Sequence, residues 1–354
     1  MVLIDEPALI FYTSVRSVSI MKANLLLASL LIVVGACSSD ETSTPLVFES
    51  SQEGDQWWLS VHVRSKSEQW VVGGVPGKGR IIQNDGAGWN IVDPGADVGL
   101  LNWVHGFDNG DLIIVGEEGT ILDRTGGTWS EQAAPNQENL WGVWGASSDD
   151  VFAVGGSGTD PSAATLHRRQ NGTWQNIPSG TGMAVDPERP TRAFFKVWGS
   201  SASDVWVVGQ SGAVVHFDGS DWKAHHTGTA KDLIAVWGTG PQHVVAVGGR
   251  NNAVIAVYRG EWTLVEDDFD FDPGVNGVWT RGDTVHIAGL QGTLFTASVG
   301  KATKTGTTEL PTDLDMHAIH AAPDGTITTV GGNFLFQNGP YKGAIFTGTL
   351  GSDQ

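Results

Sequence analysis

The sequence predicts an all-β protein built from seven copies of one unit of four antiparallel strands. Short apolar stretches rich in Val, Ile and Trp, bounded by Gly, follow one another after residue 45, as is typical of strands. Dipeptides that favour positive φ, such as Asn171-Gly172 and Asp218-Gly219, separate the third and fourth stretches. A glycine that ends the second stretch recurs about every 40 residues, which indicates a repeat. These glycines are Gly73, Gly116, Gly155, Gly209, Gly248, Gly289 and Gly331.

The clearest copy of the unit is residues 194–222, and it recurs at 140–174 and 233–262. Looser copies begin near Leu59, Leu101, Val275 and Met316. Each unit has two apolar stretches joined by a short turn with Ser and Asp, then a loop, a third stretch, a two-residue turn and a last stretch opened by Trp. Radial repetition of four-stranded antiparallel sheets forms a β-propeller, so we predict seven blades.

The two chain ends are expected to share one blade. The last unit lacks its fourth strand, whereas the segment Leu46–Ser50 precedes the first unit and belongs to none. We therefore predict that this segment supplies the outer strand of the last blade, which closes the ring and removes an exposed sheet edge. The propeller then covers residues 45–354.

The N-terminal residues have the pattern of a processing segment. A lysine precedes an apolar run and small residues, and Val34-Gly35-Ala36-Cys37 resembles the bacterial lipobox. The prediction is a signal peptide over 1–36, with Met21 as the true start, and a lipidated tether over 37–44. The resemblance implies acylation of Cys37, the one cysteine of the chain, and Ser38 after it favours the outer membrane. A plain signal peptide is the alternative.

Composition excludes several classes of function. The formal net charge is −19, so nucleic acid is not expected as a partner, because phosphate binding needs clustered Lys and Arg. A single Cys forms no intrachain disulfide and no cysteine-based metal centre. The motifs of lipases, zinc peptidases and phosphate-binding loops are not found in the sequence.

The units resemble the BNR or Asp-box class of propeller repeats, and within it the photosystem II assembly factor-like units. The matching residues include Val115-Gly116, Gly119-Thr120-Ile121 and Gly126-Gly127-Thr128-Trp129. These motifs build the fold, so the resemblance implies architecture more than activity. Some members of the class are sialidases. The Arg cluster and the Tyr–Glu pair of those enzymes are not found here.

Two sets of repeated polar residues have competing explanations. Acids before the second strand of several units either stabilise the turn, which we favour, or act as catalytic groups. These acids are Asp111, Asp150, Asp204, Asp283 and Asp324. One position of the first strand carries either His or Trp, which either packs between blades or, for the three His, holds zinc. That position is occupied by His62, His105, Trp144, Trp198, Trp237, Trp279 and His320.

An acidic stretch after residue 265 is a candidate calcium site. Asp268, Asp270 and Asp272 alternate with other residues, which allows their carboxylates to turn toward one ion. A solvated acidic loop is the alternative, because the glycine and glutamate of an EF-hand loop are not at the required spacing. No cofactor is required by the sequence, and Ca²⁺ is the candidate.

Length variation predicts where a partner binds. In a propeller, the fourth-to-first and second-to-third connections emerge on one face, here called the loop face, and the short turns emerge on the opposite turn face. Nearly all long inserts fall on the loop face, where Arg189, Arg192, Phe334 and Tyr341 are candidate contact residues.

We therefore expect a monomeric, non-catalytic module that binds an envelope protein or glycan and touches the membrane through its lipid alone. The alternative is a hydrolase or lyase acting on envelope or extracellular polysaccharide, with Ca²⁺ as a candidate ion.

Overall fold

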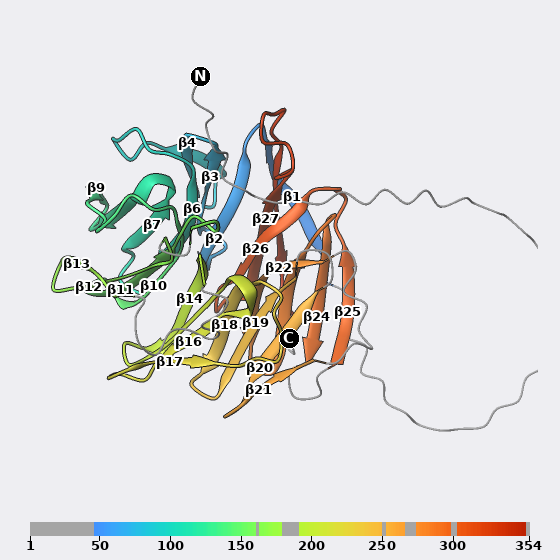
Figure 1. Ribbon diagram of the computed structural model, residues 1–354. Coiled ribbons are helices and arrows are strands. Elements are labelled where there is room, and N and C mark those ends of the chain that lie inside the picture. Colours follow the sequence, from blue (N-terminus) through green and yellow to red (C-terminus); the bar gives the residue numbers. More distant parts are fainter. Residues whose placement is uncertain are drawn as a thin grey trace, which may run out of the picture.

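The computed structural model describes residues 46–160, 163–178, 191–249, 253–265, 274–298 and 303–351. Over these residues the chain forms seven antiparallel four-stranded sheets that follow one another around a central axis, so the predicted seven-bladed β-propeller is confirmed (Figure 1). Blades are numbered along the chain, and their strands are lettered A to D from the axis outward.

The strands of each blade, in the order A to D, have the following bounds. Blade 1 comprises β2 Trp57–Ser65, β3 Glu68–Val75, β4 Lys78–Asn84 and β5 Trp89–Val92; blade 2 comprises β6 Leu101–Gly106, β7 Leu112–Gly116, β8 Ile121–Thr125 and β9 Thr128–Gln132. Blade 3 comprises β10 Leu140–Ser147, β11 Asp150–Gly155, β12 Thr165–Gln170 and β13 Thr173–Asn176; blade 4 comprises β14 Phe194–Ser201, β15 Asp204–Gly209, β16 Val214–Phe217 and β17 Trp222–His225. Blade 5 comprises β18 Leu233–Gly240, β19 His243–Gly248, β20 Val254–Tyr258 and β21 Trp262–Leu264; blade 6 comprises β22 Val275–Arg281, β23 Thr284–Gly289, β24 Thr293–Ser298 and β25 Thr303–Glu309. Blade 7 comprises β26 Asp315–Ala321, β27 Thr326–Gly332, β28 Gly343–Thr349 and, as its strand D, β1 Phe48–Gly54; two single 3-10 turns are η1 Glu117–Gly119 and η2 Gln210–Gly212.

The ring closes as predicted, with the first strand of the chain in the last blade. Strand β1 pairs antiparallel with β28, from Phe48 opposite Gly348 to Gly54 opposite Gly343. In Figure 1 the blue β1 lies beside the red strands of blade 7. The strand begins and ends a few residues later than predicted from Leu46–Ser50, and Ser51 donates from its hydroxyl to the Ile345 carbonyl across a bulge. Strand β1 thus covers the edge of β28.

Every strand A contains a β-bulge at the same place, which the sequence did not predict. The pairing of strands A and B skips one residue per blade near the loop face. The skipped residues are Leu59, Asn102, Trp141, Phe195, Ile234, Asn276 and His317. Beside the bulge, the backbone leading into strand A comes very close to the end of strand B. This close approach explains the recurrent glycine of strand B, because a Cβ on Gly155 would lie 1.9 Å from the Asn139 carbonyl oxygen.

The apolar core lies between neighbouring blades. One cluster joins Phe152 of blade 3, Trp206 of blade 4 and Ala246 of blade 5. A buried ion pair also crosses between blades, since Arg169 Nη1 of β12 lies 2.5 Å from Asp123 Oδ2 of β8. Burial raises the pKa of Asp123, while the Arg169 guanidinium opposes that shift. The blades therefore form one packed ring around the channel that the A strands line.

Candidate functional site

The channel is filled at its turn-face end by the repeated aromatic position of strand A. The His62 ring centroid lies 5.0 Å from that of His320 and 6.3 Å from that of His105. Trp237 of blade 5 reaches His320 of blade 7 at 5.3 Å, so these rings converge on the axis. The rings also pack over the next blade, as predicted, because a Cβ on Gly199 would lie 2.7 Å from the Trp144 ring.

The three histidines of this level are kept neutral by burial, and two of them also hydrogen-bond to the backbone. The Val63 amide donates to His320 Nδ1 at 3.1 Å, and His105 Nε2 donates to the Gly145 carbonyl at 3.1 Å. Burial lowers the pKa of His105 to about 4 and that of His320 to about 3. No group of three or more His, Cys, Asp or Glu among the described residues could hold a metal ion, so the zinc alternative finds no support there.

A single lysine occupies the middle of the channel. Lys196 of β14 is 6% exposed, and its Nζ donates to the Trp141 carbonyl at 2.7 Å and lies 4.2 Å from the centre of the Trp103 ring. The side chain passes beside Gly142, where a Cβ would lie 3.3 Å from Lys196 Cδ. Burial lowers the pKa of Lys196 to about 7. Lys196 belongs to no repeated pattern of the sequence and was therefore not predicted as a site residue.

A small cavity separates Lys196 from the aromatic level below it. It measures about 20 Å³ and is lined by side chains of blades 2 to 6. The lining residues that carry a polar side-chain atom are Lys196, His105, Trp103, Trp144 and Trp237. This volume suits about one water molecule. The lining contains no acid and no arginine, so the carboxylate pair of a glycosidase does not meet at this cavity.

The bulge residues of strand A form the loop-face mouth of the channel. Trp141, Phe195 and Ile234 stand side by side in blades 3 to 5 and are half-buried. Asn276 and His317 continue the ring in blades 6 and 7, where each contacts a backbone carbonyl of the next blade. Burial, and after it the charge of the Lys196 ammonium, lowers the pKa of His317 to about 3. The mouth is thus aromatic on one side and polar on the other.

The connection between β27 and β28 corrects part of the predicted contact set. Phe334 is 6% exposed and packs with Trp57, Leu59 and Leu100, so its ring is not available to a partner. The Tyr341 ring packs edge-on against Trp57, and its hydroxyl donates to the Gln337 carbonyl. The prediction of Phe334 as a contact residue is wrong, because the loop folds this ring inward.

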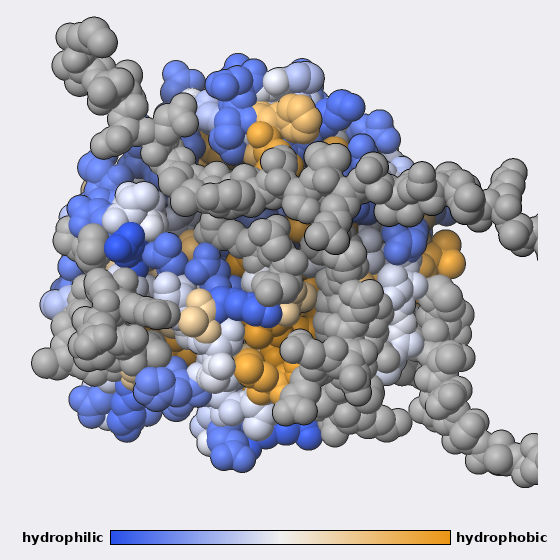
Figure 2. Space-filling model, turned by 45° about the vertical axis from the view of Figure 1, so that its right-hand side comes forward, coloured by the Kyte–Doolittle hydropathy of each residue, from blue (hydrophilic) through white to orange (hydrophobic). Residues whose placement is uncertain are grey.

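The exposed apolar residues of this loop are instead the two that follow Phe334. Leu335 is 50% exposed and Phe336 is 54% exposed. The loop that carries them is fixed by Asn333, whose side chain accepts from Trp57 Nε1 and from the Lys342 amide and donates to the Pro340 carbonyl. Figure 2 shows hydrophobic residues reaching the surface near the middle of one face, amid hydrophilic residues.

The other predicted residues divide between exposed and undescribed positions. Arg192 is exposed just before β14, and its carbonyl accepts from Gly158 of the neighbouring loop of blade 3. Arg189, Cys37 and the acidic stretch with Asp268, Asp270 and Asp272 lie outside the described residues. Among the described residues, no helix is long and apolar enough to cross a membrane.

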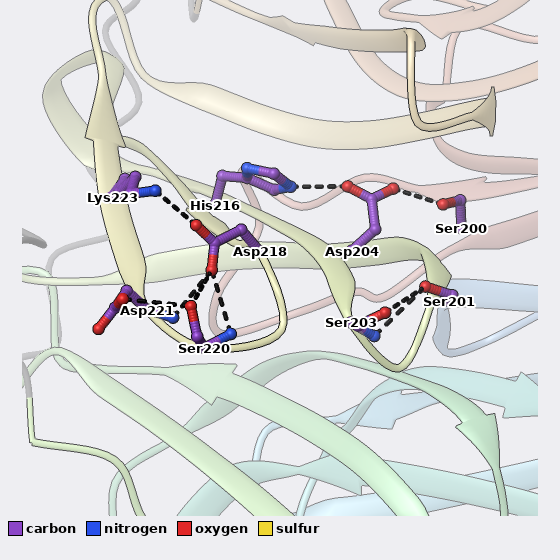
Figure 3. Close-up of polar contacts among 9 residues, drawn as sticks. All are labelled: Ser200, Ser201, Ser203, Asp204, His216, Asp218, Ser220, Asp221 and Lys223. Atoms are coloured by element: carbon purple, nitrogen blue, oxygen red, sulfur yellow. Dashed lines mark hydrogen bonds and ion pairs between the residues drawn. The ribbon is translucent and has the colours of Figure 1, made fainter.

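On the turn face, the acids at the start of strand B form hydrogen bonds with side chains of the same blade. In blade 4, His216 Nε2 lies 2.6 Å from Asp204 Oδ1, and Ser200 donates to the other carboxylate oxygen (Figure 3). In blade 3, Arg168 donates two hydrogen bonds of 2.8 Å to Asp150. The Ser200 hydroxyl does not meet the His216 ring, because the Asp204 carboxylate stands between them, so these three residues do not have the order of a catalytic Ser–His–Asp triad. These acids therefore link strands A, B and C of their blades. A structural role in the turn between strands A and B was predicted, but the partners on strand C were not.

Comparisons with known proteins agree on the fold. No family model matches the sequence, and no curated protein matches it. Similar solved structures include the WD40 β-propeller domain of Doa1, at 13% identity and a TM-score of 0.63 over 84% of this chain and 96% of that chain. YCF48 from Cyanidioschyzon merolae has 13% identity and a TM-score of 0.61 over 85% and 98%. A structure of YCF48 bound to D1 peptide has 16% identity and a TM-score of 0.58 over 88% and 98%. At these identities the similarity shows a shared propeller fold, including that of the photosystem II assembly factor.

Proposed function

We propose that this chain is a non-catalytic binding propeller that docks a protein partner on its loop face, and that a lipid on Cys37 holds it at the bacterial outer membrane. The exposed pair Leu335–Phe336 is the observation that carries the first part. Two large apolar side chains stand half exposed on a loop whose base is fixed by Asn333, Phe334 and Tyr341. Burying such side chains against a partner contributes roughly 25 cal/mol per Å² of apolar area.

The surroundings of the pair support a protein partner over a glycan. Trp141, Phe195 and Ile234 add half-buried apolar surface at the channel mouth on the same face. Aromatic anchors within a polar rim are the usual composition of protein-binding hot spots. A YCF48 propeller has been solved with a bound peptide, which supports the same use of this fold.

Affinity capture from envelope extract tests the loop face directly. We expect the double variant Leu335→Ser/Phe336→Ser to lose a partner that the wild-type chain retains, measured by quantitative mass spectrometry. Ile91→Ser is the matched control, because Ile91 is 71% exposed but lies on β5, the outer strand of blade 1. Equal loss in both variants, or retention of every protein by the double variant, would contradict the proposal.

The membrane anchor has a separate test. The lipobox-like residues before Cys37 support acylation, and several acyl chains on one residue give stable anchoring at roughly 0.8 kcal/mol per buried CH₂. We expect labelled palmitate to be incorporated into the wild-type chain and not into Cys37→Ser. The variant should move from the outer-membrane fraction to the soluble fraction. An unchanged distribution would contradict anchoring through Cys37.

The polysaccharide hydrolase alternative lacks a supporting observation among the described residues. Its discriminating feature is a convergence of acids and arginines at the channel mouth, whereas the channel offers Lys196, histidines and aromatic rings. The binding function therefore has the better support.

A further inference from the structure

We propose that the channel of this propeller binds a carboxylate of a peptide partner, with Lys196 Nζ as its cationic contact. The inference rests on the protein-binding function proposed above and names the chemistry of the partner. It begins from one residue, the buried lysine that lines the small cavity together with His105, Trp144 and Trp237 of the aromatic level.

The lysine is not required by the repeat. The six equivalent positions of strand A hold uncharged residues, and four of them hold Gly or Ala. These positions are Ser60, Trp103, Gly142, Ala235, Gly277 and Ala318. A blade therefore forms at this level without a charge, and the lysine needs an explanation beyond packing.

The ammonium group is buried without a counter-ion in the described part of the chain. Its described contacts are a hydrogen bond to the Trp141 carbonyl and the face of the Trp103 ring, so two of its three N–H donors have no described acceptor. Burying an unpaired charge costs several kcal/mol, and a hydrophobic residue of similar size is often more stable at such a position. A ligand anion supplies the missing partner.

The groups around Lys196 favour an anion rather than a cation. His317 of blade 7 is close enough for the lysine to repel its protonated form, and His105 lines the same cavity. No acid lines the cavity. A carboxylate placed here would offset the charge of Lys196, and it would accept a hydrogen bond from an ammonium, which contributes about 1.5–3 kcal/mol.

The size of the site selects the ligand. The cavity of about 20 Å³ has room for about one oxygen atom, so one oxygen of a carboxylate can enter it, whereas the three terminal oxygens of a phosphate cannot. The half-buried residues Trp141 and Phe195 directly precede Gly142 and Lys196 on the loop-face side, and they provide apolar surface for the adjoining peptide chain. The carboxylate is either a peptide C-terminus or a Glu side chain.

Three synthetic peptides separate these sources and test the site. They are N-acetyl-pentaalanine with a free carboxylate, the same peptide as its amide, and N-acetyl-Ala-Ala-Glu-Ala-Ala amide. Calorimetry or NMR titration is done on the folded chain at pH 6, where Lys196 is charged. We expect at least one carboxylate peptide to bind about 10-fold or more tighter than the neutral amide.

Variants then assign the effect to Lys196. Lys196→Met should remove the preference for the carboxylate peptide, whereas Lys342→Met, at an exposed lysine of the loop face, should keep it. Lys196→Gln replaces the Met variant if that one does not fold. Equal binding of acid and amide peptides, or an unchanged preference without Lys196, overturns the proposal. Loss of partner capture on changing Leu335 and Phe336 would stand in either case, so the two proposals fail separately.

Discussion

Lys196 shows how much a single residue can differ from its equivalents in a repeat fold. It crosses from blade 4 toward Trp103 of blade 2, and the missing side chain at Gly142 leaves room for its path. A Cβ on Gly142 would also lie 2.8 Å from the Phe195 carbonyl oxygen. The glycine and the lysine therefore belong to one local arrangement of blades 3 and 4.

Lys196 makes the free energy of unfolding depend on pH between neutral and alkaline values. Its pKa in the folded chain is about 7, below the usual 10.5, so the unfolded chain binds more protons between these values. The free energy of unfolding should thus rise with pH across this window, by at most about 1.4 kcal/mol per pH unit. Urea unfolding of Lys196→Met should lack this rise and show higher stability near pH 7. A parallel pH dependence in both chains would count against a buried ammonium.

The predicted calcium site can be tested by substituting its three aspartates. If Asp268, Asp270 and Asp272 bind one ion, calorimetry with Ca²⁺ should give a saturable signal that the triple Asp→Asn variant loses, because carboxylates are the ligands this ion prefers. Exposed Asp93 and Asp97, in another loop-face connection, provide the control substitutions. A signal that survives the triple change assigns the ion elsewhere.

Strands β8 and β12 carry the one described ion pair that crosses two blades with both side chains nearly buried. Arg169 also donates to the Ser148 carbonyl, so its guanidinium links three segments. Arg169→Met leaves Asp123 buried without its partner and should lower the free energy of unfolding by about 3–5 kcal/mol. Asp123→Leu/Arg169→Met should recover most of that loss in urea unfolding, since no uncompensated charge remains. Equal destabilisation of both variants would show that packing, not charge, dominates.

Strand β1 stabilises the ring by pairing with an otherwise open edge, and Phe48 also packs against the core of blade 7. Six residue pairs join it to β28, and each cross-strand pair contributes roughly 0.2–1 kcal/mol. Removing residues 1–54 should therefore lower the free energy of unfolding by roughly 1–6 kcal/mol and expose β28 to association. Removing residues 1–45 is the control and should change neither quantity. Size-exclusion chromatography and urea unfolding measure both, and an unaffected monomer lacking β1 would contradict this role.

The whole molecule should be sensitive to acid because several histidines are buried as neutral groups. Burial lowers the pKa of His105 and His286 to about 4, and His317 and His320 to about 3, all below the usual 6.5. The unfolded chain therefore binds more protons below pH 6.5, and the free energy of unfolding falls as pH decreases toward 4.

The slope should reach about 1.4 kcal/mol per pH unit for each such histidine. Unfolding by urea at a series of pH values measures it. His286→Leu provides the comparison, because both ring nitrogens of His286 are buried without a described partner, and its slope should be smaller by about one proton. Identical slopes in the two chains would refute the assignment of His286.

The fold could be predicted from the sequence because seven copies of one pattern each indicate the same unit of four strands. Spacing of glycines and the unit without a fourth strand were sufficient for blade number and ring closure. The candidate site depends instead on residues that occur once, such as Lys196, and on contacts between blades. Phe334 and Phe336 are two residues apart with equal hydrophobicity, and only the packing of the loop on Trp57 decides which ring is buried.

If Cys37 carries a lipid as proposed, the direction in which β1 enters blade 7 decides which face of the disc lies nearer the anchor. Strand β1 runs from Phe48, opposite Gly348, to Gly54, which leads into strand A of blade 1 through a loop-face connection. Its first residue therefore lies on the turn-face side of the disc. The anchored end of the chain would then join the disc on the turn-face side, opposite the face that carries Leu335 and Phe336, and a partner could reach that pair without passing the anchor.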